Sequence, residues 1–472
     1  MAAGWSGVGR IVRRVGVLEC AAGTGFAALK LLYAARAVFG DGPAGLPCVI
    51  VGADTELYLE SARAPLTSKA LLAGIEPFGY PLFLKAVGSD WRIAVVVQTL
   101  VSIAAWSWLA WSVRVLVTHR TAAIVGGLGI LATGLAASFQ VYDVAISTES
   151  LSVSLLVATT AAAVGLRAGT TGRRVAVLLV FLGLAATMRD TNAVIALTVA
   201  AMAAVAIVFR RGEWRRLGAV AAVSLLIGLA ALGSAQIGRR WYLQTVDTVA
   251  IRMVGDGNEG SERFLVARGL PMSPAVQELH DDFEGRYPEL VARSPRFVPY
   301  LDWIDAEGRA AYLAYLVRHP GYVLGEPLAH ADEMMLPDQG YLGVRFGCTI
   351  EVDPVTRRLG ALGFAEVPAV AFVWTLLAAL GIAGLAWRGV GAQRASARLV
   401  VLLGFTAVPH LLAVYHGDAL ELGRHSLGVA AQFRVVTWLA TAVLIEVALA
   451  RRGQSVGAMP TGHEAPVPPK PQ

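Results

Sequence analysis

Residues 51–91 read VGADTELYLESARAPLTSKALLAGIEPFGYPLFLKAVGSDW and lie between two strongly apolar runs. The stretch begins with polar side chains, among them Asp54, Glu56 and Tyr58, and continues into the apolar segment PFGYPLFL at 77–84. A membrane-spanning helix needs about 20 mainly apolar residues, so PFGYPLFL is too short to cross a bilayer. The stretch is therefore predicted to connect two membrane spans without being one.

The composition of the whole chain agrees with this prediction. Of the 472 residues, 56% are hydrophobic and only 16% are charged, and the mean hydropathy is +0.59. Soluble domains carry about 25% charged residues. The formal charge of +6 is modest and the arginines stand in small separate groups, so we expect no nucleic-acid partner. The chain is predicted to be an all-α integral membrane protein.

Ten apolar segments are long enough to be considered as spans. They are 15–37, 93–116, 121–139, 144–166, 174–188, 191–209, 217–237, 366–387, 398–415 and 427–449. The fifth and sixth are separated only by MRDTN at 188–192. We predict two short spans that meet at this polar turn. The alternative is one long helix with a buried Arg189.

Basic residues in the short connections predict the orientation, because they collect on the cytoplasmic side. Small groups of arginines recur on every second connection, as ten spans with both termini in the cytoplasm would require. We therefore predict this topology, in a bacterial inner membrane. The acids show the opposite bias. All but four of the 34 Asp and Glu residues fall on the outer side or at its border, the exceptions being Glu19, Glu213, Glu446 and Glu464.

Four regions follow from this layout. We predict a transmembrane core over 1–237 that contains the first outer loop at 38–92, and an extracytoplasmic segment over 238–365. C-terminal transmembrane helices follow over 366–452, and the Pro-rich tail at 453–472 is expected to be disordered in the cytoplasm. An amphipathic helical stretch, EGRAAYLAYLVRHPGYVL, lies in the outer segment, with Pro320 as a helix stop.

Charged residues at the outer edge of the spans are functional candidates, because an ionisable group is costly there. They come from five connections: Asp54 and Glu56; Asp143 and Glu149; Arg189 and Asp190; Arg239 and Arg240; and Asp418, Glu421, Arg424 and His425. We expect a cleft that holds acids and arginines together. Two plainer interpretations stay open: Arg239 and Arg240 as interfacial anchors, and Glu421 as a local helical partner of Arg424 and His425.

The three cysteines show no zinc-binding spacing. Cys48 and Cys348 both fall on the predicted outer side, where they could form a disulfide or remain free thiols. The cluster HADE, from His330 to Glu333, could ligate a metal or form a solvated helix face.

The first outer loop resembles that of the GT-C superfamily of integral membrane glycosyltransferases, which includes protein O-mannosyltransferases, aminoarabinose transferases and arabinofuranosyltransferases. The resemblance rests on GADTELYLESA, then EPFGYPLFLKAVG, then a span that opens AVVVQTL. The matching residues are Asp54, Tyr58, Pro77, Gly79, Tyr80 and Pro81. Looser matches are Glu149, Arg189, YLVRHPGYVL and ELGRHSLG. Glu56 departs from the pattern, because Thr55 separates it from Asp54.

The resemblance implies a fold and a reaction. The fold is a GT-C-like helical bundle whose first outer loop forms interfacial helices carrying Tyr58 and Tyr80. The reaction is inverting transfer of a sugar from a polyprenyl-phosphate donor to a glycan, lipid or protein acceptor at the outer face of the membrane. Asp54, with Glu56 beside it, would be the general base that takes the acceptor proton.

The remaining site residues are implied in the same way. Arg189, Arg424 and His425 would bind the donor phosphate. Asp143 and Glu149 would orient an arginine or hold Mg²⁺ or Mn²⁺. Lys30, inside the first span, could reach the same phosphate or pair with a buried acid.

Three other functions remain as alternatives. They are a transporter or flippase of lipid-linked sugars, a GT-C-like glycan ligase or polymerase, and a non-catalytic membrane scaffold. A transporter would need charges near the middle of the bilayer and broken helices. The charges of this chain instead cluster towards one face, which favours the transferase.

Overall fold

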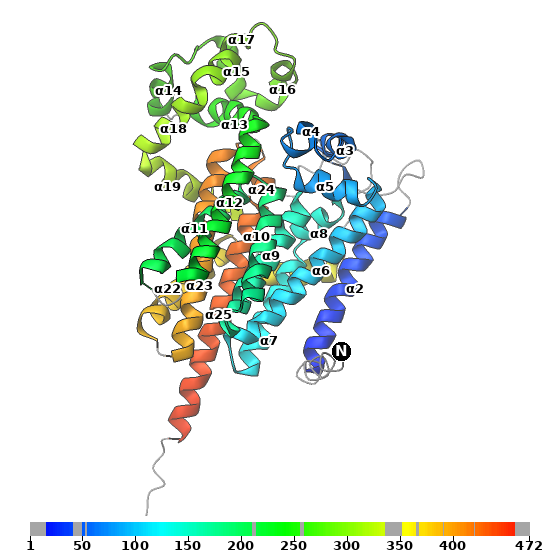
Figure 1. Cartoon of the computed structure of the whole chain (residues 1–472), viewed down its shortest axis with the longest axis vertical. Helices are drawn as coiled ribbons and strands as arrows, with labels where there is room; N and C mark the ends of the chain where they lie inside the picture. Colours follow the sequence, from blue (N-terminus) through cyan, green and yellow to red (C-terminus); the bar gives the residue numbers. More distant parts are fainter. Residues whose placement is uncertain are drawn as a thin grey trace, which may run out of the picture.

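The fold was obtained as a computed structural model that describes residues 16–40, 50–51, 54–209, 214–254, 259–335, 352–364, 368–389, 391–419 and 421–457. Figure 1 shows long helices side by side in one bundle, with shorter helices gathered at one end, which we call the loop end. Within the described ranges, seven helices are long and apolar enough to cross a membrane, or eight if one bent pair counts as a span. The prediction of an all-α multi-pass membrane protein is confirmed.

The bundle is built from ten long helices. They are α2 (Val17–Phe39), α6 (Trp91–Leu116), α7 (Arg120–Gly134), α9 (Glu149–Gly165), α10 (Gly172–Met188), α11 (Asn192–Phe209), α12 (Trp214–Ile237), α22 (Pro368–Arg388), α23 (Gly391–Gly417) and α25 (Leu427–Gly457). Each predicted span therefore corresponds to a helix. Two of them, α7 and α10, are too short to span a membrane as single straight helices.

Two predicted spans have wrong boundaries. The segment 121–139 is not one helix, because α7 ends at Gly134 and a short α8 (Ala137–Asp143) follows at an angle of 56°. The carbonyl of Gly363, on α21 (Pro354–Phe364), accepts a hydrogen bond of 3.0 Å from the Thr133 hydroxyl beside this bend. The segment 144–166 is also too long, because its first residues form strand β2 (Ala145–Ile146) and α9 begins only at Glu149.

The predicted break at 188–192 is confirmed. Helix α10 ends at Met188 and α11 begins at Asn192, and both helices contact α12. The side chain of Asn192 holds the turn by donating to the Ala185 carbonyl at 2.8 Å and to the Ser152 hydroxyl at 2.9 Å. The alternative of one long helix with a buried Arg189 is therefore wrong.

The first loop folds into β1 (Ile50–Val51) and three short helices, α3 (Thr55–Arg63), α4 (Lys69–Leu72) and α5 (Gly79–Ala86). Glycine at position 79 allows α5 to approach the end of α10, since a Cβ there would lie 2.5 Å from the Thr187 hydroxyl. The rings of Tyr58 and Tyr80 pack edge to face, with centroids 5.1 Å apart, and both are buried. These tyrosines therefore lie in the protein interior and not at the lipid interface.

The chain between α12 and α22 forms a second group of short helices. They are α13 (Trp241–Thr248), η5 (Val249–Met253), α14 (Glu259–Val266), α15 (Pro274–Asp281), α16 (Phe283–Val291), α17 (Val298–Trp303), η6 (Ile304–Gly308), α18 (Arg309–Arg318), α19 (Pro320–Ala329), α20 (Ala331–Met335) and α21. Its helices from α13 to α18 share a core of their own, with Phe297, Tyr300 and Ile304 fully buried. Pro320 separates α18 from α19, as predicted.

Two further elements are η3 (Leu166–Ala168), after α9, and α24 (Leu422–His425), between α23 and α25. The proposed partners Cys48 and Cys348 lie outside the described residues, as does the tail from 458 onward.

Candidate functional site

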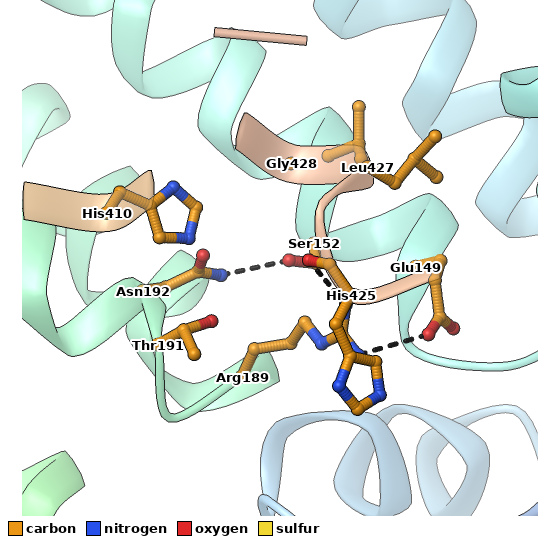
Figure 2. Close-up of a pocket in the computed structure, with 10 residues that line it drawn as sticks. Glu149, Ser152, Arg189, Thr191, Asn192, His410, His425, Leu427 and Gly428 are labelled. Atoms are coloured by element: carbon orange, nitrogen blue, oxygen red, sulfur yellow. Dashed lines mark hydrogen bonds and ion pairs between the residues drawn. The ribbon is translucent and has the colours of Figure 1, made fainter. Parts of the chain in front are cut away.

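Charged side chains from four separate parts of the chain meet at the loop end of the bundle. We call Asp54, Glu149, Arg189, Glu421, Arg424 and His425 the arginine cluster. Part of it lines a narrow crevice between α9, the α10–α11 turn and the start of α25. Figure 2 shows Arg189 and Glu149 facing one another, with the ring of His425 beside them. The predicted meeting of residues from distant connections is thus present in the fold.

The pair of strands places two of these carboxylates. Strand β1 pairs with β2 in parallel, with Val51 opposite Ile146. Asp54 and Glu149 each follow the last paired residue by three positions, where each chain turns into a helix. The Thr55 hydroxyl donates to the Ile146 carbonyl at 3.0 Å and ties the two turns together. The strand register therefore places Asp54 and Glu149 at the same end of the strand pair.

Arg424 is the centre of the cluster. Its Nη1 donates to Asp54 Oδ2 at 2.8 Å, its Nε lies 3.5 Å from Glu149 Oε1, and its Nη2 pairs with Glu421. The guanidinium is 11% exposed and Asp54 is 28% exposed, so Asp54 is the more open partner. The surrounding carboxylates outweigh the cost of burial and raise the pKa of Arg424 well above its ordinary value. This arginine is therefore always charged.

Glu149 is buried, at 1% exposure, yet it is loosely held. Its Oε1 lies 3.3 Å from Arg189 Nη2 and 3.5 Å from Arg424 Nε, longer than the 2.7–2.9 Å typical of charge-assisted hydrogen bonds. Within the described residues, the two carboxylate oxygens of Glu149 make no well-formed hydrogen bond. The same is true of the Nε of Arg424. Native proteins leave few buried polar atoms unsatisfied, so these atoms need a physical explanation.

His425 has both ring nitrogens engaged. Its Nδ1 pairs with the Asp418 carboxylate, and its Nε2 lies 3.1 Å from Arg424 Nη2. These partners assign a neutral ring that donates from Nδ1 and accepts at Nε2. Burial lowers the pKa of His425, which favours the same neutral form. The ring therefore holds Arg424 in place and has no free nitrogen for a phosphate.

Two acids near Asp54 have raised pKa values: Glu76, which the sequence analysis left out, and Glu421, a member of the arginine cluster. Burial, followed by the nearby Asp54 carboxylate, raises the pKa of Glu76 to about 8. Burial also raises the pKa of Glu421 to about 7, although Arg424 acts against it. Glu76 therefore holds its proton near neutral pH, while Glu421 stays paired with Arg424. The position of Glu76, directly before PFGYPLFL, was the available sequence signal.

Arg240 fastens the first loop to the bundle. It binds Asp190 through two hydrogen bonds, 2.7 Å from Nε and 2.9 Å from Nη2, and its Nη1 donates to the Gly74 carbonyl at 3.1 Å. It is 6% exposed, so the interpretation as an interfacial anchor is wrong for Arg240. Arg239 instead has an exposed side chain paired with Asp305. The two adjacent arginines thus have different environments.

Two of the residues predicted for the site, Asp143 and Glu56, lie elsewhere, whereas the buried Tyr58 is within electrostatic range of Asp54 and Arg424. Asp143 forms a buried ion pair with Lys30, which settles the open question about that lysine. Ser102 and Ser150 donate to Asp143 at 3.3 Å and 2.6 Å, and Lys30 also donates to Ser102 at 2.9 Å. We call Lys30, Ser102, Asp143 and Ser150 the lysine cluster. Glu56 points into solvent on α3, and Tyr58 is part of the loop core.

The residues of the arginine cluster do not fit a divalent cation. Asp54, Glu149 and Glu421 all converge on Arg424, so each carboxylate already faces a positive charge. In the ranges that the structure describes, no group of three or more His, Cys, Asp or Glu side chains could hold a metal ion. Of the HADE cluster, His330 and Glu333 line a separate groove that is described below.

No protein family model and no curated protein matches the chain. Among solved structures, the chain is similar to the oligosaccharyltransferase AglB from Archaeoglobus fulgidus in complex with an inhibitory peptide and a dolichol-phosphate. The TM-score is 0.47 at 14% identity, over 95% of this chain and 53% of that chain. The apo form of the Archaeoglobus fulgidus oligosaccharyltransferase gives a TM-score of 0.44 at 12% identity, over 92% of this chain and 52% of that chain.

ArnT from Cupriavidus metallidurans in the apo state gives a TM-score of 0.30 at 15% identity, over 90% of this chain and 76% of that chain. This chain spans about half the length of the oligosaccharyltransferase.

Proposed function

We propose that this protein transfers a sugar, with inversion, from a polyprenyl-phosphate donor to an acceptor hydroxyl at the outer face of a bacterial inner membrane. One observation carries the proposal. Two guanidiniums, Arg189 and Arg424, meet an unsatisfied buried carboxylate at the end of a membrane bundle, and the more open Asp54 lies within hydrogen-bond distance of Arg424. Both termini would then lie in the cytoplasm.

The arginines would serve the leaving group. Arginine matches the oxygens of a phosphate in a forked geometry, and a preorganised positive charge at low dielectric stabilises the charge that develops in the transition state. The 3.3 Å contact of Arg189 with Glu149 would let this guanidinium turn towards a phosphate, and Arg424 would meet the phosphate by exchanging its bond to Asp54. The polyprenyl tail would stay among the apolar helices while the sugar-phosphate meets the two guanidiniums at the loop end.

Asp54 would then take the acceptor proton. In the free protein Asp54 Oδ2 is occupied, because it accepts a hydrogen bond from Arg424 at 2.8 Å. A donor phosphate that engages Arg424 would release Asp54 Oδ2 to meet the acceptor hydroxyl. The acceptor oxygen attacks the anomeric carbon, and its proton moves to the Asp54 carboxylate. The bond from the anomeric carbon to the phosphate oxygen breaks, and polyprenyl phosphate leaves with that electron pair.

The proposal is tested with the purified full-length chain in lipid nanodiscs. The chain is incubated with a panel of polyprenyl-phosphate and polyprenyl-diphosphate sugars and a panel of hydroxyl acceptors, and released carrier lipid is measured. We expect at least one donor to be consumed, with inverted stereochemistry in the product. Since general-base catalysis contributes about 10²–10⁴-fold, Asp54→Asn should reduce the rate by that factor.

The matched control is Glu60→Gln, which removes an exposed acid from the same helix α3. It should keep the wild-type rate. Consumption of no donor, or equal rates for Asp54→Asn and Glu60→Gln, would contradict the proposal. Retained activity in Asp54→Asn together with donor movement across the bilayer would instead support a flippase.

A further inference from the structure

A second and larger groove opens beside the arginine cluster. It has a volume of about 810 Å³ and lies between η5, the helices α18 to α20, and the end of α23. In Figure 1 these short helices lie at the loop end, and α19 is the part of this group that descends onto the bundle. The function proposed above uses none of these residues.

Aromatic rings dominate one wall of this groove. The rings of Tyr315 and His319 stack with centroids 4.1 Å apart, and Tyr322 packs edge to face on Tyr315 at 5.1 Å. Tyr415 lies 5.4 Å from the ring of His330 and donates to Glu326 at 3.3 Å. A wall of fixed rings with a few placed polar groups is the usual form of a small-molecule site. Flat rings suit the C–H faces of sugars in particular.

The charges in the groove favour a neutral ligand. Its lining carries two carboxylates, Glu326 and Glu333, against one guanidinium, Arg252. That guanidinium is already occupied, since it stacks on the Tyr415 ring with its central carbon 3.9 Å from the centroid and donates to the Tyr415 carbonyl. A phosphorylated or otherwise acidic ligand would meet net repulsion here. Carboxylates and imidazoles do suit the hydroxyl groups of a neutral sugar, because they accept hydrogen bonds.

The groove reaches the site through the α23–α24 connection. Ala419 and Leu422 line the groove, and Leu422 belongs to the same short helix α24 that carries Arg424 and His425. Glu421, beside Leu422, pairs with Arg424. A chain-like ligand seated along the aromatic wall can therefore extend one end over this turn towards Asp54.

From this placement we infer that the groove is the acceptor subsite and that the acceptor is a neutral glycan. This inference rests on the proposed transferase function. The rings of Tyr322 and His319 would stack on successive sugar units, and Glu326 would accept hydrogen bonds from their hydroxyls. The terminal hydroxyl would then be presented to Asp54.

Binding and transfer are measured separately, so that the two proposals can fail separately. Binding of linear gluco-, manno- and arabino-hexaoses to the full-length chain in nanodiscs is followed by saturation-transfer NMR without any donor. The variants are Tyr322→Ala and the more conservative Glu326→Gln. The controls are Leu324→Ala on the same helix α19 and Glu307→Gln on η6, since both residues are exposed and neither lines the groove.

We expect at least one hexaose to bind, with affinity reduced about tenfold or more in Tyr322→Ala and Glu326→Gln and unchanged in both controls. Asp54→Asn should bind the hexaose like wild type, whether or not transfer occurs. Binding of no hexaose, or equal binding by groove variants and controls, would overturn the inference. Capture of an unglycosylated acceptor peptide that competes with the hexaose at Tyr322 would also overturn it, in favour of a protein acceptor.

Discussion

Two buried clusters of charge in this molecule differ in how well their atoms are satisfied. In the lysine cluster, Lys30 and Asp143 pair directly, and Ser102 and Ser150 supply further hydrogen bonds to Asp143. In the arginine cluster, Glu149 lies 3.3 Å and 3.5 Å from two guanidiniums and makes no well-formed hydrogen bond within the described residues. Both sets of acids lie towards the loop end of the bundle.

Under the proposed function, this difference would separate a structural ion pair from a site prepared for a ligand. A buried charge pair is stable only when its remaining polar atoms are satisfied. The lysine cluster meets that condition with protein groups alone. The arginine cluster does not, so a ligand with phosphate and hydroxyl oxygens would complete it. The sequence analysis gave Asp143 and Glu149 the same role in the site. Their environments differ only because their partners do: Asp143 pairs with Lys30, and Glu149 faces two arginines.

The largest effect on stability is expected from breaking the lysine cluster. Lys30→Met leaves the Asp143 carboxylate buried without its cation, which should cost about 3–5 kcal/mol of unfolding free energy. The double variant Lys30→Met/Asp143→Leu should recover most of that loss, because no charge is then buried. Unfolding of each variant in detergent, with transfer measured per folded molecule, checks both statements. A large loss of activity in a folded double variant would place Lys30 in the reaction after all.

The next largest effect should separate two neighbouring arginines. Arg240→Met removes a buried guanidinium and its two hydrogen bonds to Asp190, and bonds to charged groups contribute about 1.5–3 kcal/mol each. Arg239→Met removes an exposed ion pair, which contributes about 0–1 kcal/mol. Unfolding curves of the two variants give the comparison directly. Similar losses would mean that Arg240 does not fasten the first loop.

Arg189→Lys tests the arginine cluster without removing its charge. A lysine keeps the attraction to Glu149 but loses the forked geometry that suits phosphate. We expect transfer to fall about tenfold, which corresponds to about 1.4 kcal/mol, with an unfolding midpoint close to wild type. Much of this fall should appear as a higher steady-state KM for the donor. A variant with normal kinetics and reduced stability would make Arg189 a structural residue like Lys30.

The smallest effect concerns pH and is expected near the arginine cluster, because Glu76 lies close to Asp54 and has no such counterpart at the lysine cluster among the described residues. The folded-state pKa of Glu76 is raised from an ordinary value of 4.5 to about 8. The folded chain thus binds this proton more tightly than the unfolded chain, so Glu76 makes stability fall as pH rises from about 4.5 to about 8. Glu76→Gln should flatten that part of the profile.

Thermal unfolding at pH 5, 7 and 9 in one detergent measures this flattening. Glu60→Gln, on the exposed face of α3, is the control and should follow wild type. A Glu76→Gln profile that falls as steeply as wild type would mean that Glu76 is already ionised at neutral pH.

The sequence predicted a large part of the fold because hydrophobic length and charge are local properties. The ten helical segments, the break before Asn192 and the stop at Pro320 follow from apolar runs and from residues that end helices. The bend after Gly134 was missed; it lies where Thr133 contacts Gly363, more than two hundred residues away in the sequence. The strand pair was missed as well, because strands of two residues are too short to show an alternation of polar and apolar side chains.

For the site, the sequence by itself determined which residues carry suitable chemistry and that they collect at one end of the bundle. It placed Asp54, Glu149, Arg189, Arg424 and His425 in one candidate group, and these five do meet. Only the tertiary structure decided that Asp143 belongs to Lys30, that Glu56 faces solvent and that Glu76 joins the group. The physical reason is that a charge takes its role from its nearest partners, and those partners come from distant parts of the chain.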